Sequence, residues 1–146
     1  FSAFTSMLKI LRRELDDAGY ETMYLDGDTP AQRRVEMAEQ FNAGQGQIFL
    51  ISLKAGGTGL NLTGADMVIH YDPWWNPAAE DQATDRAYRI GQTRKVEVIR
   101  LVTHASIEEQ VVALGQRKKA LFDQLIKPGE SMVGGLSPQE IMSLFQ

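Results

Sequence analysis

The sequence predicts an α/β domain with a mainly parallel sheet flanked by helices, and three observations lead to this fold class. Short apolar segments alternate along the chain with longer segments of helical periodicity, an order typical of parallel sheets covered by helices on both faces. Residues 47–53 form an almost continuous apolar run, as does a strand buried on both faces of a parallel sheet. A glycine-rich loop at residues 55–59 follows that strand directly, at the end where such folds bind ligands.

The first predicted elements are a helix and a strand. Apolar residues recur at helical spacing from Met7 to Leu15, and Gly19 ends this pattern. Residues 22–25 predict a short strand, and the Asp-Gly-Asp sequence of residues 26–28 predicts a turn after it.

A second helix is predicted to start at residues 29–32. Thr29 is expected to cap it, Pro30 to take the first helical position, and Gln32 to complete the capping pattern. Apolar residues continue the helical spacing to about Gly44.

The next predicted unit is a short buried strand at residues 67–71 and the helix that follows it. Asn76 and Pro77 begin this helix, which we expect to run to about Ile90, where Gly91 ends it.

The last predicted strand covers residues 96–102. Residues 106–109, Ser-Ile-Glu-Glu, form a capping box that opens a helix of about five turns. Residues 127–136 contain one Pro and three Gly and predict a linker, after which Ser137 caps a last short helix.

The composition is that of one globular domain. Hydrophobic residues make up 43% and charged residues 23% of the 146 residues, and no apolar stretch is long enough to span a bilayer. Cysteine is absent and the two histidines, His70 and His104, are isolated, so no metal site is predicted. The net charge of −4 neither supports nor excludes a nucleic-acid partner. We interpret the basic run of residues 117–119 as a solvated helix face.

The glycine-rich loop has two readings. Its backbone N–H groups could cradle a phosphate group, or the glycines could serve a tight turn that needs positive φ. The loop lacks the Gly-Lys-Ser/Thr sequence of a Walker A motif, and Leu62 stands where a dinucleotide fingerprint has its last glycine.

Two adjacent tryptophans, Trp74 and Trp75, lie in a turn between two prolines. Neighbouring residues in a rigid turn rarely both point into one core. We therefore expect Trp74 to be packed and the Trp75 ring to be exposed as a surface on which bases can stack.

The helix that contains residues 82–90 is the most informative segment. Gln82, Arg86 and Arg89 are spaced to share one helical face. Asp85 is placed to pair with Arg89, whereas Arg86 has no acidic residue three or four positions away. Paired arginines suit a polyanion or a phosphoryl group, and spacing alone does not choose between ATP and nucleic-acid phosphate.

Several long motifs, in order, resemble the second lobe of SNF2-family (SWI2/SNF2) helicase-like ATPases of superfamily 2. The resemblance covers residues 1–126, with Tyr88 standing where the family often has His. Its motifs are motif IV with its neighbour at residues 4–8, 25–34 and 41–42, motif V at residues 52–62, and motif VI at residues 75–77 and 82–92.

This resemblance implies a RecA-like, three-layer domain over residues 1–126, with a C-terminal helical extension in residues 127–146. It implies that Arg86 and Arg89 are catalytic and act on ATP bound to a first lobe of the same polypeptide, with Mg²⁺ held mainly by that lobe. The remaining expected site residues contact the nucleotide or DNA. They are Gly59, Asn61 and Gln82 on the nucleotide side and Lys54, Gly57, Thr58 and Trp75 on the DNA side.

The implied protein is an ATP-dependent translocase on duplex DNA that remodels protein–DNA complexes. Because the chain contains neither a Walker A motif nor an Asp-Glu dipeptide, we expect it to be the second lobe only, monomeric and inactive by itself. Bacterial cytoplasm or a eukaryotic nucleus is the expected location. The alternative is a non-catalytic DNA- or protein-binding module with a RecA-like shell, while the Arg-Ile-Gly-Gln sequence at residues 89–92 disfavours an RNA helicase.

Overall fold

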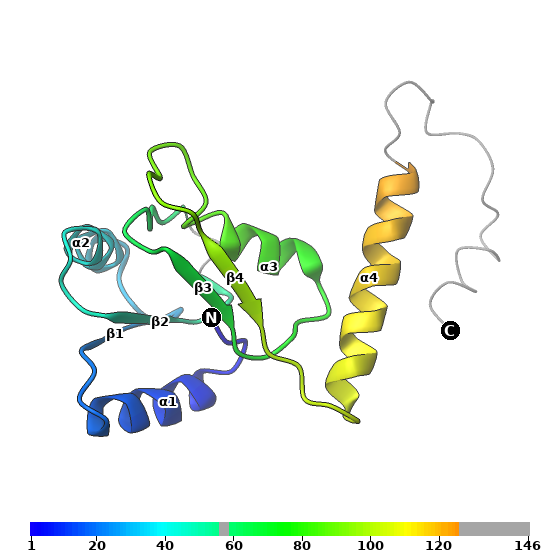
Figure 1. The fold of residues 1–146 in the computed structure, drawn as a ribbon, viewed down its shortest axis with the longest axis horizontal. Coiled ribbons are helices and arrows are strands. Elements are labelled where there is room, and N and C mark those ends of the chain that lie inside the picture. Colours follow the sequence, from blue (N-terminus) through cyan, green and yellow to red (C-terminus); the bar gives the residue numbers. More distant parts are fainter. Residues whose placement is uncertain (56–58, 126–146) are drawn as a thin grey trace.

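The computed structural model describes residues 1–55 and 59–125. The predicted linker, the predicted last helix, Gly57 and Thr58 lie outside the described residues. Helices and strands alternate except that β3 follows β2 with no helix between them among the described residues (Figure 1). The order is α1 (Thr5–Asp17), β1 (Thr22–Leu25), α2 (Ala31–Asn42), β2 (Ile48–Ile51), β3 (Met67–His70), α3 (Pro77–Thr84), β4 (Glu97–Arg100) and α4 (Ile107–Leu125).

The strands form two parallel pairs that the first two residues join. Strand β1 pairs with β2, and β3 pairs with β4, so the prediction of a parallel sheet is confirmed. Ser2 lies beside β2, where its N–H donates to the Ile51 carbonyl over 3.3 Å. Phe1 lies beside β3, where its carbonyl accepts a 2.9 Å hydrogen bond from the Tyr71 N–H. Residues 1 and 2 therefore occupy the centre of one sheet.

Helices lie on both faces of this sheet, although the α1 side of β3 stays open. Helix α1 packs on β1 and β2, and its Arg12 guanidinium lies 5.7 Å from the centre of the Tyr24 ring. Leu25 and Ile51 point to the opposite face, where they form the main core cluster with Ala38 of α2. The register places His70 on the same face as Leu25 and Ile51, and its Nε2 lies 2.9 Å from the hydroxyl of Thr84 in α3. Helices α2 and α3 therefore share one face, and α1 lies on the other.

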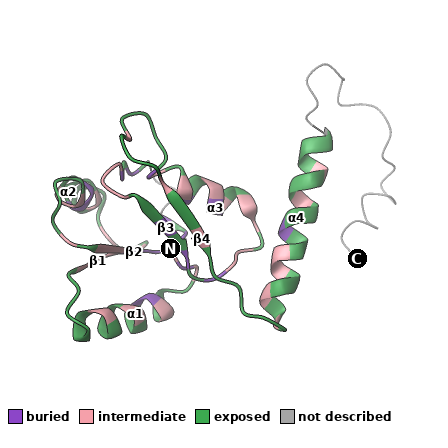
Figure 2. Ribbon diagram, viewed as in Figure 1, coloured by how far each residue is buried: buried purple, intermediate pink, exposed green. Residues whose placement is uncertain are grey.

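Strand β3 is buried on one face only, so the prediction of a short buried strand holds for that face and not for the other. Val68 and His70 are buried, whereas Met67 and Ile69 point to the α1 side and are 48% and 40% exposed. Figure 2 shows how burial varies over the strands and helices. An apolar sequence run marks a strand but does not show how many of its faces are covered.

The start of α2 also differs from the expectation, because Thr29 does not cap this helix. Helix α2 begins at Ala31 without a side-chain cap, because the Thr29 hydroxyl accepts a hydrogen bond from the Asp26 N–H over 3.1 Å instead. The Arg34 guanidinium donates to the carbonyls of Thr29 and Gly27 over 2.7 and 2.9 Å. The turn is therefore held from α2, and Thr29 belongs to the turn and not to the helix.

Candidate functional site

The segment that follows the glycine-rich loop is fixed by side chains of α2. Gly59 is exposed with φ of +75°, a conformation that glycine adopts without strain. Asn42 donates its amide to the Asn61 carbonyl and accepts from the Gly64 N–H, both over 2.8 Å. Residues 59–61 therefore have a set path across the surface, with their polar backbone accessible at Gly59 and Asn61.

The segment that carries the two predicted catalytic arginines is not a helix. Helix α3 ends at Thr84, and residues 85–90 form successive turns, so the expected helix to Ile90 was wrong. The carbonyl of Arg86 accepts from the Leu62 N–H over 2.8 Å, and that of Ala87 accepts from the Gln92 side chain over 3.0 Å. Tertiary hydrogen bonds thus use carbonyls that a continuing helix would need.

These turns place both arginines beside the segment after the glycine-rich loop. Arg86 is half-buried, with its Nε fully buried, and its carbonyl is bonded to Leu62 as described above. Arg89 is exposed, and its Nη1 lies 3.4 Å from the Leu60 carbonyl. No ion pair joins Asp85 to Arg89 in the described part of the chain, so the expected local partner does not hold this arginine.

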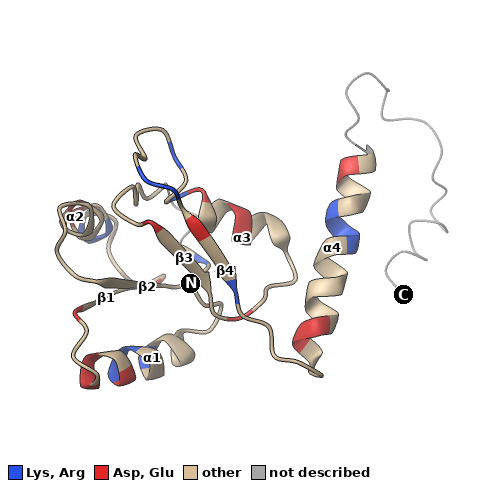
Figure 3. Cartoon of the chain, in the orientation of Figure 1, with Lys and Arg blue, Asp and Glu red and all other residues tan. Residues whose placement is uncertain are grey.

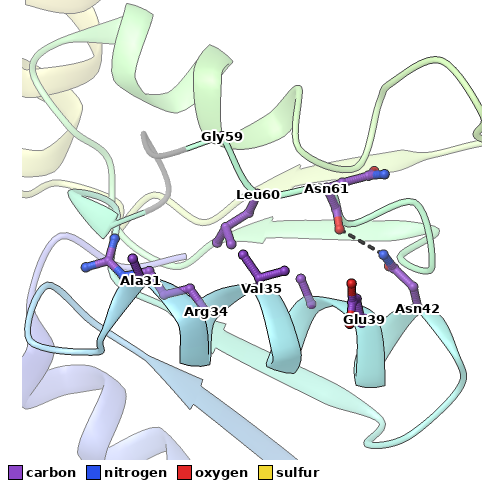
Figure 4. A pocket seen from close by; sticks show the side chains of 9 residues that line it. Ala31, Arg34, Val35, Glu39, Asn42, Gly59, Leu60 and Asn61 are labelled. Atoms are coloured by element: carbon purple, nitrogen blue, oxygen red, sulfur yellow. Dashed lines mark hydrogen bonds between the residues drawn. The ribbon is translucent and has the colours of Figure 1, made fainter.

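An open hollow of about 600 Å³ lies between α2 and residues 59–61 (Figure 4). Gly59 and Asn61 line it, together with Arg34, Val35 and Asn42. Gln82, Arg86 and Arg89 are not among its lining residues. The structure thus places Gly59 and Asn61 between the hollow on one side and the arginine segment on the other.

The two tryptophans differ in burial, as predicted. Trp74 is half-buried, while Trp75 is 47% exposed. The centres of the two rings lie 6.2 Å apart, and the Nζ of Lys118 on α4 lies 4.4 Å from the centre of the Trp75 ring. The interpretation of residues 117–119 as a solvated face was therefore wrong for Lys118, because helical periodicity does not show which neighbouring element a helix packs against.

The remaining predicted site residues are spread over the surface. Lys54 is exposed in the turn after β2, and Gln82 is exposed on α3. Gly57 and Thr58 lie outside the described residues. Within residues 1–55 and 59–125 no group of three or more His, Cys, Asp or Glu side chains is arranged to hold a metal ion. In those same residues no helix is both long and apolar enough to cross a bilayer.

Two side chains that organise this region carry no strong sequence signal. Asn42 belongs to the motif IV resemblance and Gln92 to that of motif VI, and the sequence predicts no individual role for either. Both act by bonding to backbone groups distant in sequence: Asn42 as described above, and Gln92 through a 2.8 Å hydrogen bond to the Ala65 carbonyl. Such contacts leave no local pattern, because their partners are chosen by the fold.

Comparison with known proteins agrees with this geometry. The family described as "Helicase conserved C-terminal domain" matches residues 1–91. The chain is 44% identical over 146 residues to YwqA of Bacillus subtilis, covering 99% of the chain and 16% of YwqA. It is 42% identical over 146 residues to the ATP-dependent helicase rhp16 of Schizosaccharomyces pombe, covering 99% of the chain and 17% of rhp16. The chain thus spans about one sixth of the length of these curated relatives.

A solved structure shows the same fold. The crystal structure of the C-terminal part of the Fun30 ATPase domain superposes with a TM-score of 0.75 at 41% sequence identity, covering 79% of this chain and 37% of that one. Together, these matches confirm the resemblance on which the expected site was based. The chain belongs to the helicase conserved C-terminal domain family and, within it, to the SNF2-family helicases.

Proposed function

We propose that this chain is the second motor lobe of an ATP-dependent translocase on duplex DNA. In this proposal, ATP binds to a first RecA-like lobe of the same polypeptide, and Arg86 and Arg89 reach it across the cleft between the lobes. ATP binding draws the lobes together, and hydrolysis releases them, so that each cycle shifts the grip along one DNA strand. The chain alone is inactive because it contains only half of this site.

One observation carries the proposal: the segment with the two arginines, residues 85–90, is attached to residues 60–62, which follow the glycine-rich loop. The Leu62 N–H bonds the Arg86 carbonyl, and the Leu60 carbonyl lies within reach of Arg89. Two arginines are therefore held next to the segment that begins at the exposed Gly59. Guanidinium groups in such a position neutralise charge that develops on a transferring phosphoryl group.

The residues present fit the phosphate groups of ATP better than they fit its metal ion. At Gly59 an added Cβ would have no neighbour within 4 Å among residues 1–55 and 59–125, so these residues leave the backbone open to an approaching anion. We propose that Gly59, Asn61 and Gln82 face the nucleotide. The described residues supply no carboxylate cluster, so we propose that Mg²⁺ is held by the first lobe, where it would neutralise phosphate charge.

The DNA side of the proposal rests on residues at the carboxyl ends of strands. Lys54 follows β2 and Trp75 follows β3, and both are exposed. Gly57 and Thr58 lie outside the described residues, and we propose their contact with DNA from their motif positions alone. Contacts of this kind hold the DNA backbone without reading sequence. The protein would then act wherever its DNA lies, in bacterial cytoplasm or in a nucleus.

The test is DNA-stimulated ATP hydrolysis by the protein that contains both lobes. Arg86→Ala and Arg89→Ala should each lower turnover by roughly 10³–10⁵-fold, the range known for arginine fingers, while duplex binding persists. The 146-residue chain alone should hydrolyse no ATP.

Arg94→Ala is the matched control, because Arg94 lies near the same segment but pairs with Asp66 over 3.3 Å at the surface. Its turnover should stay close to that of the unaltered protein. Normal turnover in both Arg86→Ala and Arg89→Ala would remove the catalytic role. A two-lobe protein that binds DNA but never hydrolyses ATP would favour the non-catalytic binding module.

A further inference from the structure

Lys118 on α4 occupies a defined position against the exposed tryptophan. Its Nζ lies 4.4 Å from the centre of the Trp75 ring and 3.5 Å from the Asn76 side-chain oxygen. Lys118 is half-buried, whereas its neighbours Arg117 and Lys119 are exposed. An ammonium group over an indole face is attracted by the ring electrons, and this contact restricts a side chain that is otherwise flexible.

The position of Lys118 is set by the way α4 packs. Gly115, one turn earlier, is buried, and a Cβ at this position would lie 3.7 Å from both Pro77 and the Trp75 carbonyl. Lys119 forms an ion pair with Asp81 of α3 over 3.9 Å. Figure 3 shows this basic segment as a band in the C-terminal half of α4, with acidic residues near the start of the helix. Helix α4 is therefore held against Trp75 and Pro77 at Gly115 and against α3 at Lys119, so that Lys118 lies between two packing contacts.

The charge of Lys118 is not neutralised locally. Within residues 1–55 and 59–125 no carboxylate lies within 4.0 Å of its Nζ. Two acidic residues of α3 form ion pairs with other cations: Glu80 pairs with Arg100 over 3.1 Å, and Asp81 pairs with Lys119. The Asn76 contact uses one of three N–H donors at most, so the others remain available to an anion.

We infer that Lys118 binds a backbone phosphate of duplex DNA next to the nucleotide that Trp75 contacts. Helix α4 then forms part of the DNA-binding surface, and Trp75 and Lys118 act as one unit in which the ring positions the cation. This inference rests on the proposed DNA-binding role of Trp75. A fixed, unneutralised cation beside an exposed aromatic ring suits the sugar–phosphate backbone of a DNA strand, where the cation meets a phosphate and the ring packs beside the neighbouring sugar.

The experiment measures binding of the two-lobe protein to a fluorescent duplex over a range of salt concentrations. Loss of one phosphate contact lowers the slope of log Kobs against log salt by about one. Lys118→Met should therefore show this smaller slope and bind roughly tenfold more weakly at about 0.1 M salt. Lys118→Arg, which keeps the charge and the ring contact, should retain the original slope.

Lys119→Met is the matched control, because it removes the same charge from the adjacent position, where Asp81 is the partner. It should leave the slope unchanged. Thermal melting of each variant shows whether α4 still packs. If Lys118→Met melts early, Lys118→Gln replaces it in the same salt titration.

The outcomes separate this inference from the function on which it rests. If Trp75→Ala weakens binding and the Lys118 variants keep both affinity and slope, Lys118 does not contact DNA. Weaker binding by Lys118→Met with an unchanged slope would mean that Lys118 only supports the fold, and tighter binding would mean that it shields Trp75. Each of these three results overturns the inference about Lys118 but leaves the translocase proposal intact. Unchanged binding by Trp75→Ala would instead overturn the DNA-binding role of Trp75.

Discussion

At the scale of single residues, the path of residues 59–64 depends on one close contact with α2. Gly64 lies so near the end of α2 that a Cβ at this position would be 2.7 Å from the Asn42 Cα and 3.2 Å from the Phe41 carbonyl. Both neighbours are backbone atoms, which cannot rotate away as a side chain can. Glycine is required here for space and not for an unusual φ.

Gly64→Ala should therefore destabilise the chain by about 1–3 kcal/mol, the range observed for overpacked sites. Thermal unfolding followed by circular dichroism measures this effect. Gly27→Ala is the control, because a Cβ at Gly27 meets nothing within 4 Å. Equal melting temperatures for the two variants would contradict the steric argument.

At the scale of elements, the sequence predicted those parts whose cause is local. Helix α1 and strand β1 agree with their apolar spacing, and β1 has the predicted bounds. The end of α3 was missed by about six residues, because the carbonyls of Arg86 and Ala87 bond to Leu62 and Gln92. The motif resemblance names the two arginines as site residues whatever their backbone conformation, and this assignment stays a prediction. Their attachment to residues 60–62 could be learned only from the fold.

Gln92 is the side chain on which the turns at residues 85–92 depend. Its amide donates to the carbonyls of Ala65 and Ala87, and its side-chain oxygen accepts from the Arg94 N–H over 3.0 Å. Gln92→Ala leaves these groups without their partner and should cost about 1–3 kcal/mol.

Amide hydrogen exchange should locate this loss in residues 85–92, with α1 and β1 unaffected. Gln110→Ala on the exposed surface of α4 is the control and should stay within roughly 0.5 kcal/mol of the original stability. Unchanged exchange at residues 85–92 in Gln92→Ala would show that other contacts hold the turns.

At the scale of the whole molecule, residues 1 and 2 hold the two strand pairs together by backbone hydrogen bonds to residues of β2 and β3 and to the residues that follow them. The buried Asp72 carboxylate strengthens this junction, because it accepts hydrogen bonds from the Ser2 hydroxyl and from the Ala3 N–H. His70 adds an apolar contact, with its ring stacked 5.8 Å from that of Phe1. The junction is therefore buried, polar on one side and aromatic on the other.

The stability of this junction should depend on pH. Burial, the nearby Phe1 ammonium group and the Arg100 guanidinium lower the pKa of His70 from 6.5 to about 4. A basic group whose pKa is lower in the folded state than in the unfolded state favours folding while it is neutral. Its contribution is complete above pH 6.5 and is lost as the pH falls through about 4. The expected loss is on the order of 3 kcal/mol.

Burial also lowers the pKa of the Phe1 amino group from 8.0 to about 6, so its contribution is lost at higher pH, as the pH falls from 8 through about 6. Urea unfolding of the 146-residue chain between pH 8 and 4 measures both effects. His70→Asn should remove the loss of stability between pH 6.5 and 4 and keep the loss between pH 8 and 6. His104→Asn, at an exposed site, should change neither loss. A pH dependence that is identical in His70→Asn and the original chain would show that His70 does not cause the acid loss.

The half-covered strand β3 has a consequence for the behaviour of this chain in solution. Met67, Ile69 and Tyr71 lie on the open face, beside Leu101, and they leave an apolar area in contact with water. Monomeric proteins rarely leave large areas of this kind uncovered, because such areas bind one another. A concentrated sample of the isolated chain should therefore self-associate more as salt rises, since salt screens the repulsion from its net charge of −4 while favouring apolar contact.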